Sequence, residues 1–179
     1  YKPWRNGNKW TSKIQMPTAR NAFSGGVING RLYAVAGVVL NTNEEYDPVA
    51  NTWATKTVMP TARYVPSAGV IAGRLYVVGG NNMGPLNTNE EYDPASNTWA
   101  TKTIMPTARQ SLFAGVISGK LYAMGGWNNN HLNTNEEYDP ASNTWATKTV
   151  MPTVRASHSA GVINGKLYIM GGENGSTAY

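Results

Sequence analysis

The side chains that could do chemistry in this sequence are few, and they form no catalytic constellation. There are two histidines, His131 and His158. They could share one ion, but neither lies in a ligand motif, and two imidazoles alone are a weak zinc or copper signal. Catalysis needs a nucleophile or acid, a base and a stabilising group within mutual reach. We therefore predict no catalytic residue, no metal site and no cofactor.

The carboxylates and guanidinium groups recur in a fixed order instead of gathering at one point. Glutamates occur as neighbours, at Glu44-Glu45, Glu90-Glu91 and Glu136-Glu137. Because successive strand residues point to opposite faces, such neighbours do not form an acid/base pair in one site. Four arginines, each three residues after a Met-Pro pair, carry the planar fork that binds carboxylates bidentately. They are Arg20, Arg63, Arg109 and Arg155.

The composition indicates one β-rich domain. The chain has 179 residues, of which 41% are hydrophobic and 14% charged, with 19 Gly and 10 Pro. This profile is typical of a turn-rich β protein with its own core. There is no apolar run long enough to span a bilayer, so we expect no membrane insertion. With no cysteine, disulfides and thiolate sites are excluded.

The net charge of +5 could suit a nucleic acid, but the lysines are spread along the repeat. Lys56, Lys102 and Lys148 occur once per unit, on the strand expected at the outer edge of each sheet. A charge on an edge strand discourages edge-to-edge aggregation. We therefore predict no nucleic-acid partner.

An internal repeat organises the whole chain. Tryptophan recurs at intervals of 43, 46 and 46 residues. Met-Pro, Gly-Val-Ile-x-Gly and Leu-Tyr recur four times with it, and the glycine pair after Leu-Tyr and Glu-Glu-Tyr-Asp-Pro three times each. Repetition at fixed spacing is typical of packing residues, so the repeat aromatics are expected in the core. They are Trp10, Trp53, Trp99 and Trp145, with Tyr46, Tyr92 and Tyr138.

Each unit predicts four short antiparallel strands. In the second unit these are residues 67–71, 75–78, a third ending at Tyr92 and a fourth starting at Thr98. The turn between the first two is Ala72-Gly73, where both residues need a positive φ, the strongest short hairpin signal. The equivalent turns of the other units are Asn29-Gly30, Ser118-Gly119 and Asn164-Gly165.

The double glycine after Leu-Tyr, the Tyr-Asp-Pro and the following Trp resemble the Kelch motif. The resemblance covers essentially the whole chain, with one departure at Ala36-Gly37. It implies an all-β fold, a β-propeller of four-stranded antiparallel blades. It also implies that the four arginines contribute to a pocket for an acidic peptide. The alternative is that each arginine is held by a glutamate of its own unit, which its presence in every repeat favours.

The two ends of the chain predict how the ring closes. Counted through the joined termini, Trp145 and Trp10 are 44 residues apart, close to the internal spacing. We therefore expect four blades in one domain over residues 1–179, closed by pairing the N- and C-terminal strands. The blades would be residues 20–62, 63–108, 109–154, and 155–179 completed by 1–19. A part of a larger ring and two copies forming one ring are alternatives, because Kelch propellers more often have five to seven blades.

Differences between the units point to one face. The two turns at one end of each blade barely change, whereas the segment after each Arg and the loop after the glycine pair differ in every unit. Loops on a rigid scaffold commonly carry binding residues, although loops also drift without function. The candidate contacts, added to the four arginines, are Tyr64, Gln110, Trp127, His131 and His158.

The sequence thus predicts a non-catalytic module that binds a protein segment or a glycan on this face. One alternative is a structural scaffold whose rings self-associate, and another is a non-catalytic domain of a secreted sugar-active enzyme. The Asn/Thr-rich repeats without cysteine resemble bacterial Kelch repeats of secreted or surface proteins, which favours an extracellular location over a cytoplasmic one.

Overall fold

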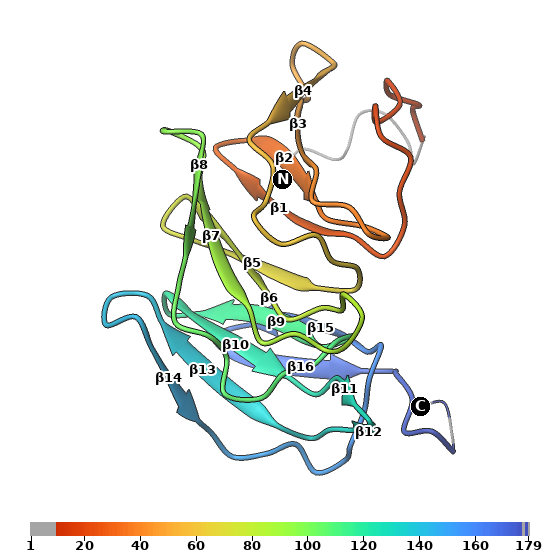
Figure 1. Cartoon of the computed structure of the whole chain (residues 1–179), viewed down its shortest axis with the longest axis vertical. Helices are drawn as coiled ribbons and strands as arrows, with labels where there is room; N and C mark the ends of the chain where they lie inside the picture. The colour runs from red at the N-terminus through yellow and green to blue at the C-terminus, as the bar shows by residue number, and fades with distance from the viewer. Residues whose placement is uncertain (1–9, 177, 179) are drawn as a thin grey trace, which may run out of the picture.

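In the computed structural model, residues 10–176 and 178 are described, and all regular structure among them is β (Figure 1). The strands are β1 (Ser24–Ile28), β2 (Arg31–Val35), β3 (Asn43–Asp47), β4 (Thr52–Lys56), β5 (Ser67–Ile71), β6 (Arg74–Val78), β7 (Asn89–Asp93), β8 (Thr98–Thr101), β9 (Phe113–Ile117), β10 (Lys120–Met124), β11 (Trp127–Asn128), β12 (Asn130–His131), β13 (Asn135–Asp139), β14 (Thr144–Thr147), β15 (Ser159–Ile163) and β16 (Lys166–Met170).

The repeat folds as predicted, with one antiparallel sheet per unit. Three units have four strands, in the orders β1-β2-β3-β4, β5-β6-β7-β8 and β9-β10-β13-β14. In the described part of the chain the fourth unit has two strands, β15 and β16, and β11-β12 is a small hairpin in the third unit. First strands lie next to one another along the series β1, β5, β9 and β15. The predicted hairpin turns are confirmed, since φ is 48° at Ala72 and 75° at Gly73.

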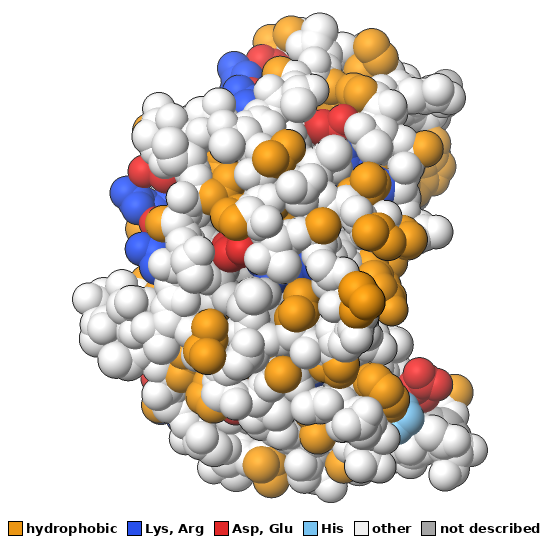
Figure 2. Space-filling view, in the orientation of Figure 1, with side chains coloured by type: hydrophobic (Ala, Val, Ile, Leu, Met, Phe, Trp, Pro, Cys, Tyr) orange, Lys and Arg blue, Asp and Glu red, His pale blue; other side chains and the backbone are white. Residues whose placement is uncertain are grey.

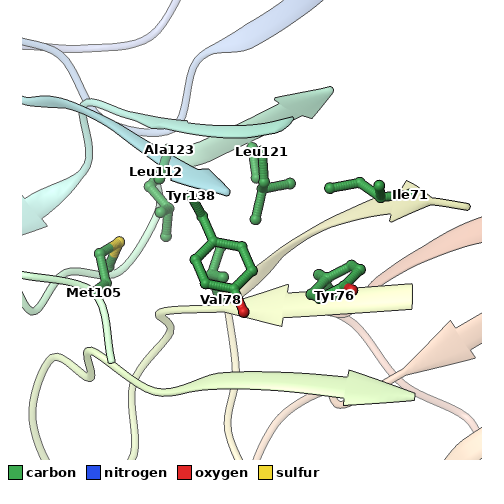
Figure 3. Packing of buried hydrophobic residues seen from close by; sticks show 9 residues of the cluster. Ile71, Tyr76, Val78, Met105, Leu112, Leu121, Ala123 and Tyr138 are labelled. Carbon is green, nitrogen blue, oxygen red and sulfur yellow. The ribbon is translucent and has the colours of Figure 1, made fainter. Parts of the chain in front are cut away.

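Neighbouring units interlock through a leucine and a glycine. A Cβ added at Gly69 of β5 would lie 2.5 Å from Leu121 Cδ1 of the next unit, and one at Gly26 would meet Leu75 and Val70. Only a glycine leaves room for the leucine to lie against the strand. Figure 3 shows Leu121 beside Tyr138, Tyr76 and Val78 in this core.

Three tryptophans, Trp53, Trp99 and Trp145, each pack at a tilt against the tyrosine of their own unit and donate a hydrogen bond to the segment before it. The Tyr92 and Trp99 rings are 5.1 Å apart. Trp99 Nε1 donates to Thr57 O at 2.9 Å, and Thr57 N donates to Asn97 Oδ1 at 3.0 Å. The third unit repeats both bonds to Thr103, so the units are joined along their outer edge by a tryptophan and an asparagine.

The predicted closure of four blades is not confirmed. Residues 10–19 hold no strand; Ile14 O accepts from Trp53 of the first unit at 3.3 Å. In Figure 1 the first sheet lies at the top, apart from the β15–β16 hairpin, which lies lower, next to the third sheet. Residues 1–9, which the expected fourth blade would use, lie outside the described part. The expectation that Trp10 is core is wrong, because it is fully exposed: no third-strand tyrosine within residues 10–176 packs against it.

Candidate interaction face

Three of the four repeat arginines form ion pairs with a glutamate inside their own unit. Arg63 is fully buried, and its Nη2 pairs with Glu90 and donates to Val77 O at 3.4 Å. Burial lowers the pKa of Arg63 to about 10, although Glu90 opposes this. Arg109 is equally buried against Glu136 at 2.9 Å. Both arginines are therefore bound by a glutamate of their own unit, which is the second of the two predicted roles. Their guanidinium groups have no exposed surface on which a ligand could bind.

The first and last arginines differ in their degree of enclosure. Arg20 pairs with Glu44, and both side chains are buried. Arg155 is half-buried and donates to Gly171 O at 2.8 Å and Thr153 Oγ1 at 2.6 Å. The fourth-unit arginine therefore lies in the same position as the others but at an open end of the array.

The second glutamate of each pair lies on the other face of its strand, as the alternation predicted. Glu45 accepts from Tyr33, from Arg31 at 2.6 Å and pairs with Lys56 at 3.3 Å. Burial alone would raise the pKa of Glu45, but the hydrogen bonds from these three residues lower it. The edge lysines are thus partners of this carboxylate, as Lys102 is of Glu91.

The variable segments after the arginines meet in a main-chain ladder between the units. Val65 N donates to Ala22 O at 2.7 Å, Ser111 N to Val65 O at 3.2 Å, and Ser157 N to Ser111 O at 2.9 Å. All four residues have a positive φ, between 47° and 55°. The backbone of this face is therefore fixed by its own hydrogen bonds while its side chains differ.

Four candidates are joined across units two and three by a chain of contacts. Tyr64 and Asn81 exchange main-chain hydrogen bonds of 3.1 and 2.9 Å, and Asn81 Nδ2 donates to Gln110 Oε1 of the next unit. Gln110 then exchanges main-chain bonds with Trp127 at 3.1 and 2.8 Å. Trp127 lies opposite His131 in the β11–β12 hairpin.

The chain of contacts continues into the fourth unit. His131 Nε2 lies 3.9 Å from Glu173 Oε1, and Glu173 exchanges main-chain bonds with Ala156. Figure 2 shows a histidine next to an acidic group on the side where β12 and the C-terminal residues lie. We call this set the variable strip: Tyr64, Asn81, Gln110, Trp127, His131 and Glu173.

Sequence reasoning missed two members of the strip, Asn81 and Glu173. Both come directly after the glycine pair of their units, and that variable position was the signal that could have found them. The side chains of Tyr64, Gln110, Trp127 and His131 are partly exposed, and Glu173 is 58% exposed at its side chain. The strip therefore offers aromatic, amide, imidazole and carboxylate groups to a partner.

His158 lies below this surface. It is 8% exposed, and neither ring nitrogen has a hydrogen-bond partner among the described residues. Burial, and then the charge of Arg155, lower its pKa to about 4. It occupies the position of Leu112 in the third unit, packed under Gly125 and Gly172. The structure therefore places His158 apart from the variable strip, as an imidazole in an apolar setting.

Within residues 10–176 and 178, no three or more His, Asp and Glu side chains come together as a metal ion would require. None of the described residues forms a helix that could cross a membrane.

Comparison with known proteins identifies the class of this fold. The model of the KLHDC2/KLHL20/DRC7 Kelch-repeats domain matches residues 5–172, so the chain belongs to this Kelch-repeat family. Kelch-repeat propellers generally serve protein interaction. A comparison with curated protein sequences gave no match.

Among solved structures, the one titled "Structure of YjhT" is similar, with a TM-score of 0.83 at 20% identity. The superposition covers 90% of this chain and 60% of that chain. The likeness extends to the fold, and about two-fifths of that structure has no counterpart in these 179 residues.

Proposed function

We propose that this chain is a non-catalytic interaction module that binds a protein segment along the variable strip. The observation that carries the proposal is that the residues that vary between units also lie together in the structure. The residues that differ between otherwise matching units are joined into one strip across three units, while the turns at the other end of the blades barely change in sequence.

The chemistry of the strip suits an extended peptide. Tyr64 and Trp127 offer aromatic surface with little rotamer entropy to lose, which is typical of residues that dominate interfaces. Gln110 and Glu173 offer polar groups that can orient a main chain. The main-chain ladder beneath holds these groups in place, so little ordering is needed on binding.

The test is a combined peptide and glycan array, with the wild type beside a triple variant, Tyr64→Ala, Trp127→Ala and His131→Ala. We expect peptide ligands that the variant loses, while its thermal midpoint stays within a few degrees of the wild type. A matched control changes the opposite turns, with Val49→Ala, Ala95→Ser and Ala141→Ser, and should keep the ligands.

Three results would overturn the proposal. Binding lost in the control but kept in the triple variant would move the site to the opposite face. Glycan hits without peptide hits would keep the face and replace the ligand class. Concentration-dependent light scattering with no array ligand would favour the structural scaffold.

A further inference from the structure

One position of the repeat takes a different chemical type in every unit. It directly follows the glycine pair, or Ala36-Gly37 in the first unit, and it holds Val38, Asn81, Trp127 and Glu173 in turn. The third and fourth units therefore place an indole and a carboxylate at equivalent points of neighbouring units. His131 links the two, because it lies opposite Trp127 in the β11–β12 hairpin and its Nε2 is 3.9 Å from Glu173 Oε1.

The His131 ring is held from two sides. Residues directly opposite in an antiparallel pair have side chains on the same face, with Cβ atoms about 5 Å apart, so Trp127 and His131 are neighbours on the hairpin surface. From the fourth unit, a Cβ added at Gly175 would lie 3.1 Å from His131 Cε1 and 3.2 Å from its Nδ1. The side chain of His131 is only 17% exposed. It therefore fixes the indole of one unit relative to the carboxylate of the next.

Glu173 is the exposed carboxylate of the variable strip. The chain has ten Asp and Glu residues, and every one except Glu173 forms an ion pair with a lysine or an arginine. Among residues 10–176 and 178, the basic side chain paired with Glu173 is His131. The glutamates that pair with Arg20, Arg63 and Arg109 are buried, whereas the Glu173 side chain is 58% exposed. The strip therefore carries a negative charge that a cation from outside can reach.

We infer that this end of the variable strip receives an arginine or lysine side chain of the bound peptide, an inference that rests on the proposed function. Glu173 pairs with the positive charge, the partly exposed Trp127 ring offers its face to the cation, and His131 positions both. Arginine suits the site better than lysine, because a planar guanidinium stacks on an indole and also reaches a carboxylate with two N–H groups. The charge is opposite to that of the acidic peptide which the Kelch resemblance implies.

The probe is an oriented library of dodecapeptides with arginine, glutamine or glutamate fixed at one central position and mixed residues elsewhere. Immobilised protein selects from the library, and mass spectrometry identifies the retained peptides. We expect the wild type to enrich arginine over glutamine by about three- to tenfold and to retain glutamate least. Glu173→Lys should reverse the order of arginine and glutamate, and Glu173→Gln should abolish the preference without reversing it.

A matched control separates the local charge from the net charge of the protein. Asp93→Lys makes the same change of charge at the opposite end of the second unit, where Asp93 pairs with Arg74, and it should keep the preference for arginine. Trp127→Leu should lower the arginine enrichment by about two- to fivefold, because it removes the aromatic face and keeps an apolar side chain. The thermal midpoint of each variant checks that the fold is retained.

The outcomes distinguish this inference from the proposed function. Peptides that the Tyr64/Trp127/His131 triple variant loses, but that show no enrichment of arginine in the wild type, would leave the proposed function standing and overturn the inference. An arginine preference that Glu173→Lys and Asp93→Lys lower equally would assign it to net charge and also overturn the inference. A wild type that retains no peptide would overturn both.

Discussion

The second and fourth units contain the same first strand in two different environments. β5 and β15 share the sequence Ser-Ala-Gly-Val-Ile, yet Ile71 is 7% exposed and Ile163 is 59% exposed. The second strands behave alike: Leu75 to Val78 are buried, whereas Tyr168 and Met170 of β16 are exposed. The difference lies in the neighbours, because β5–β6 is covered by β7, β8 and a following unit. Burial here is a property of the array and not of the strand.

The largest expected effect concerns the buried ion pair of the second unit, Arg63 and Glu90. Glu90→Ala would leave Arg63 buried without its carboxylate, and we expect a loss of about 3–5 kcal/mol in the free energy of unfolding. Chemical denaturation measures it. The double replacement Arg63→Met with Glu90→Leu should recover most of the loss. If Glu90→Ala lowers the free energy of unfolding by less than about 1 kcal/mol, the ion pair does not stabilise the unit as proposed.

A matched pair of glycines tests whether the units interlock. Gly69→Ala would bring a Cβ within 2.5 Å of Leu121 Cδ1 and 2.8 Å of Val116 Cγ2, whereas Gly161 has no atom within 4 Å of its Cβ position. We expect Gly69→Ala to cost about 1–3 kcal/mol and Gly161→Ala to stay within about 0.5 kcal/mol. Thermal unfolding of the two variants compares them directly, and equal losses would refute the interlock.

The smallest expected effect is a pH dependence from His158. Its folded-state pKa, about 4, lies below the ordinary value near 6.5. The unfolded chain therefore binds a proton first as the pH falls through 6.5, and stability drops by about 1 kcal/mol between pH 6.5 and 5.5. Above about pH 7.5 the contribution of His158 is nearly constant.

Leu112 of the third unit occupies the position of His158 and suggests a matched pair of substitutions. His158→Leu copies Leu112 and should flatten the pH dependence between 6.5 and 5.5, while Leu112→His should steepen it. Denaturant unfolding at several pH values measures both variants. An unchanged slope in His158→Leu would assign the dependence to other groups.

The sequence predicted most of the local structure but not the shape of the whole array. The strands and turns followed from the short glycine turns and the repeat spacing. The pairing of Arg63 with a glutamate of its own unit was one of the two roles that the sequence predicted for this arginine. The exposure of Trp10 was not predictable, because equal spacing between tryptophans does not report the angle between units, and for the same reason the spacing alone could not establish a four-blade closure. The link from Asn81 to Gln110 also needed coordinates, since it joins side chains 29 positions apart.

The asparagine and tryptophan bonds along the outer edge connect each unit only to the one before it. Such a molecule behaves as a one-dimensional array, whose folding free energy is a sum of unit terms and nearest-neighbour terms. Among the described residues, the two inner units have a neighbour on both sides, whereas the fourth unit has one neighbour and two strands. We therefore expect amide hydrogen exchange to be faster in β15–β16 than in β5–β7, with local opening beginning in the C-terminal unit.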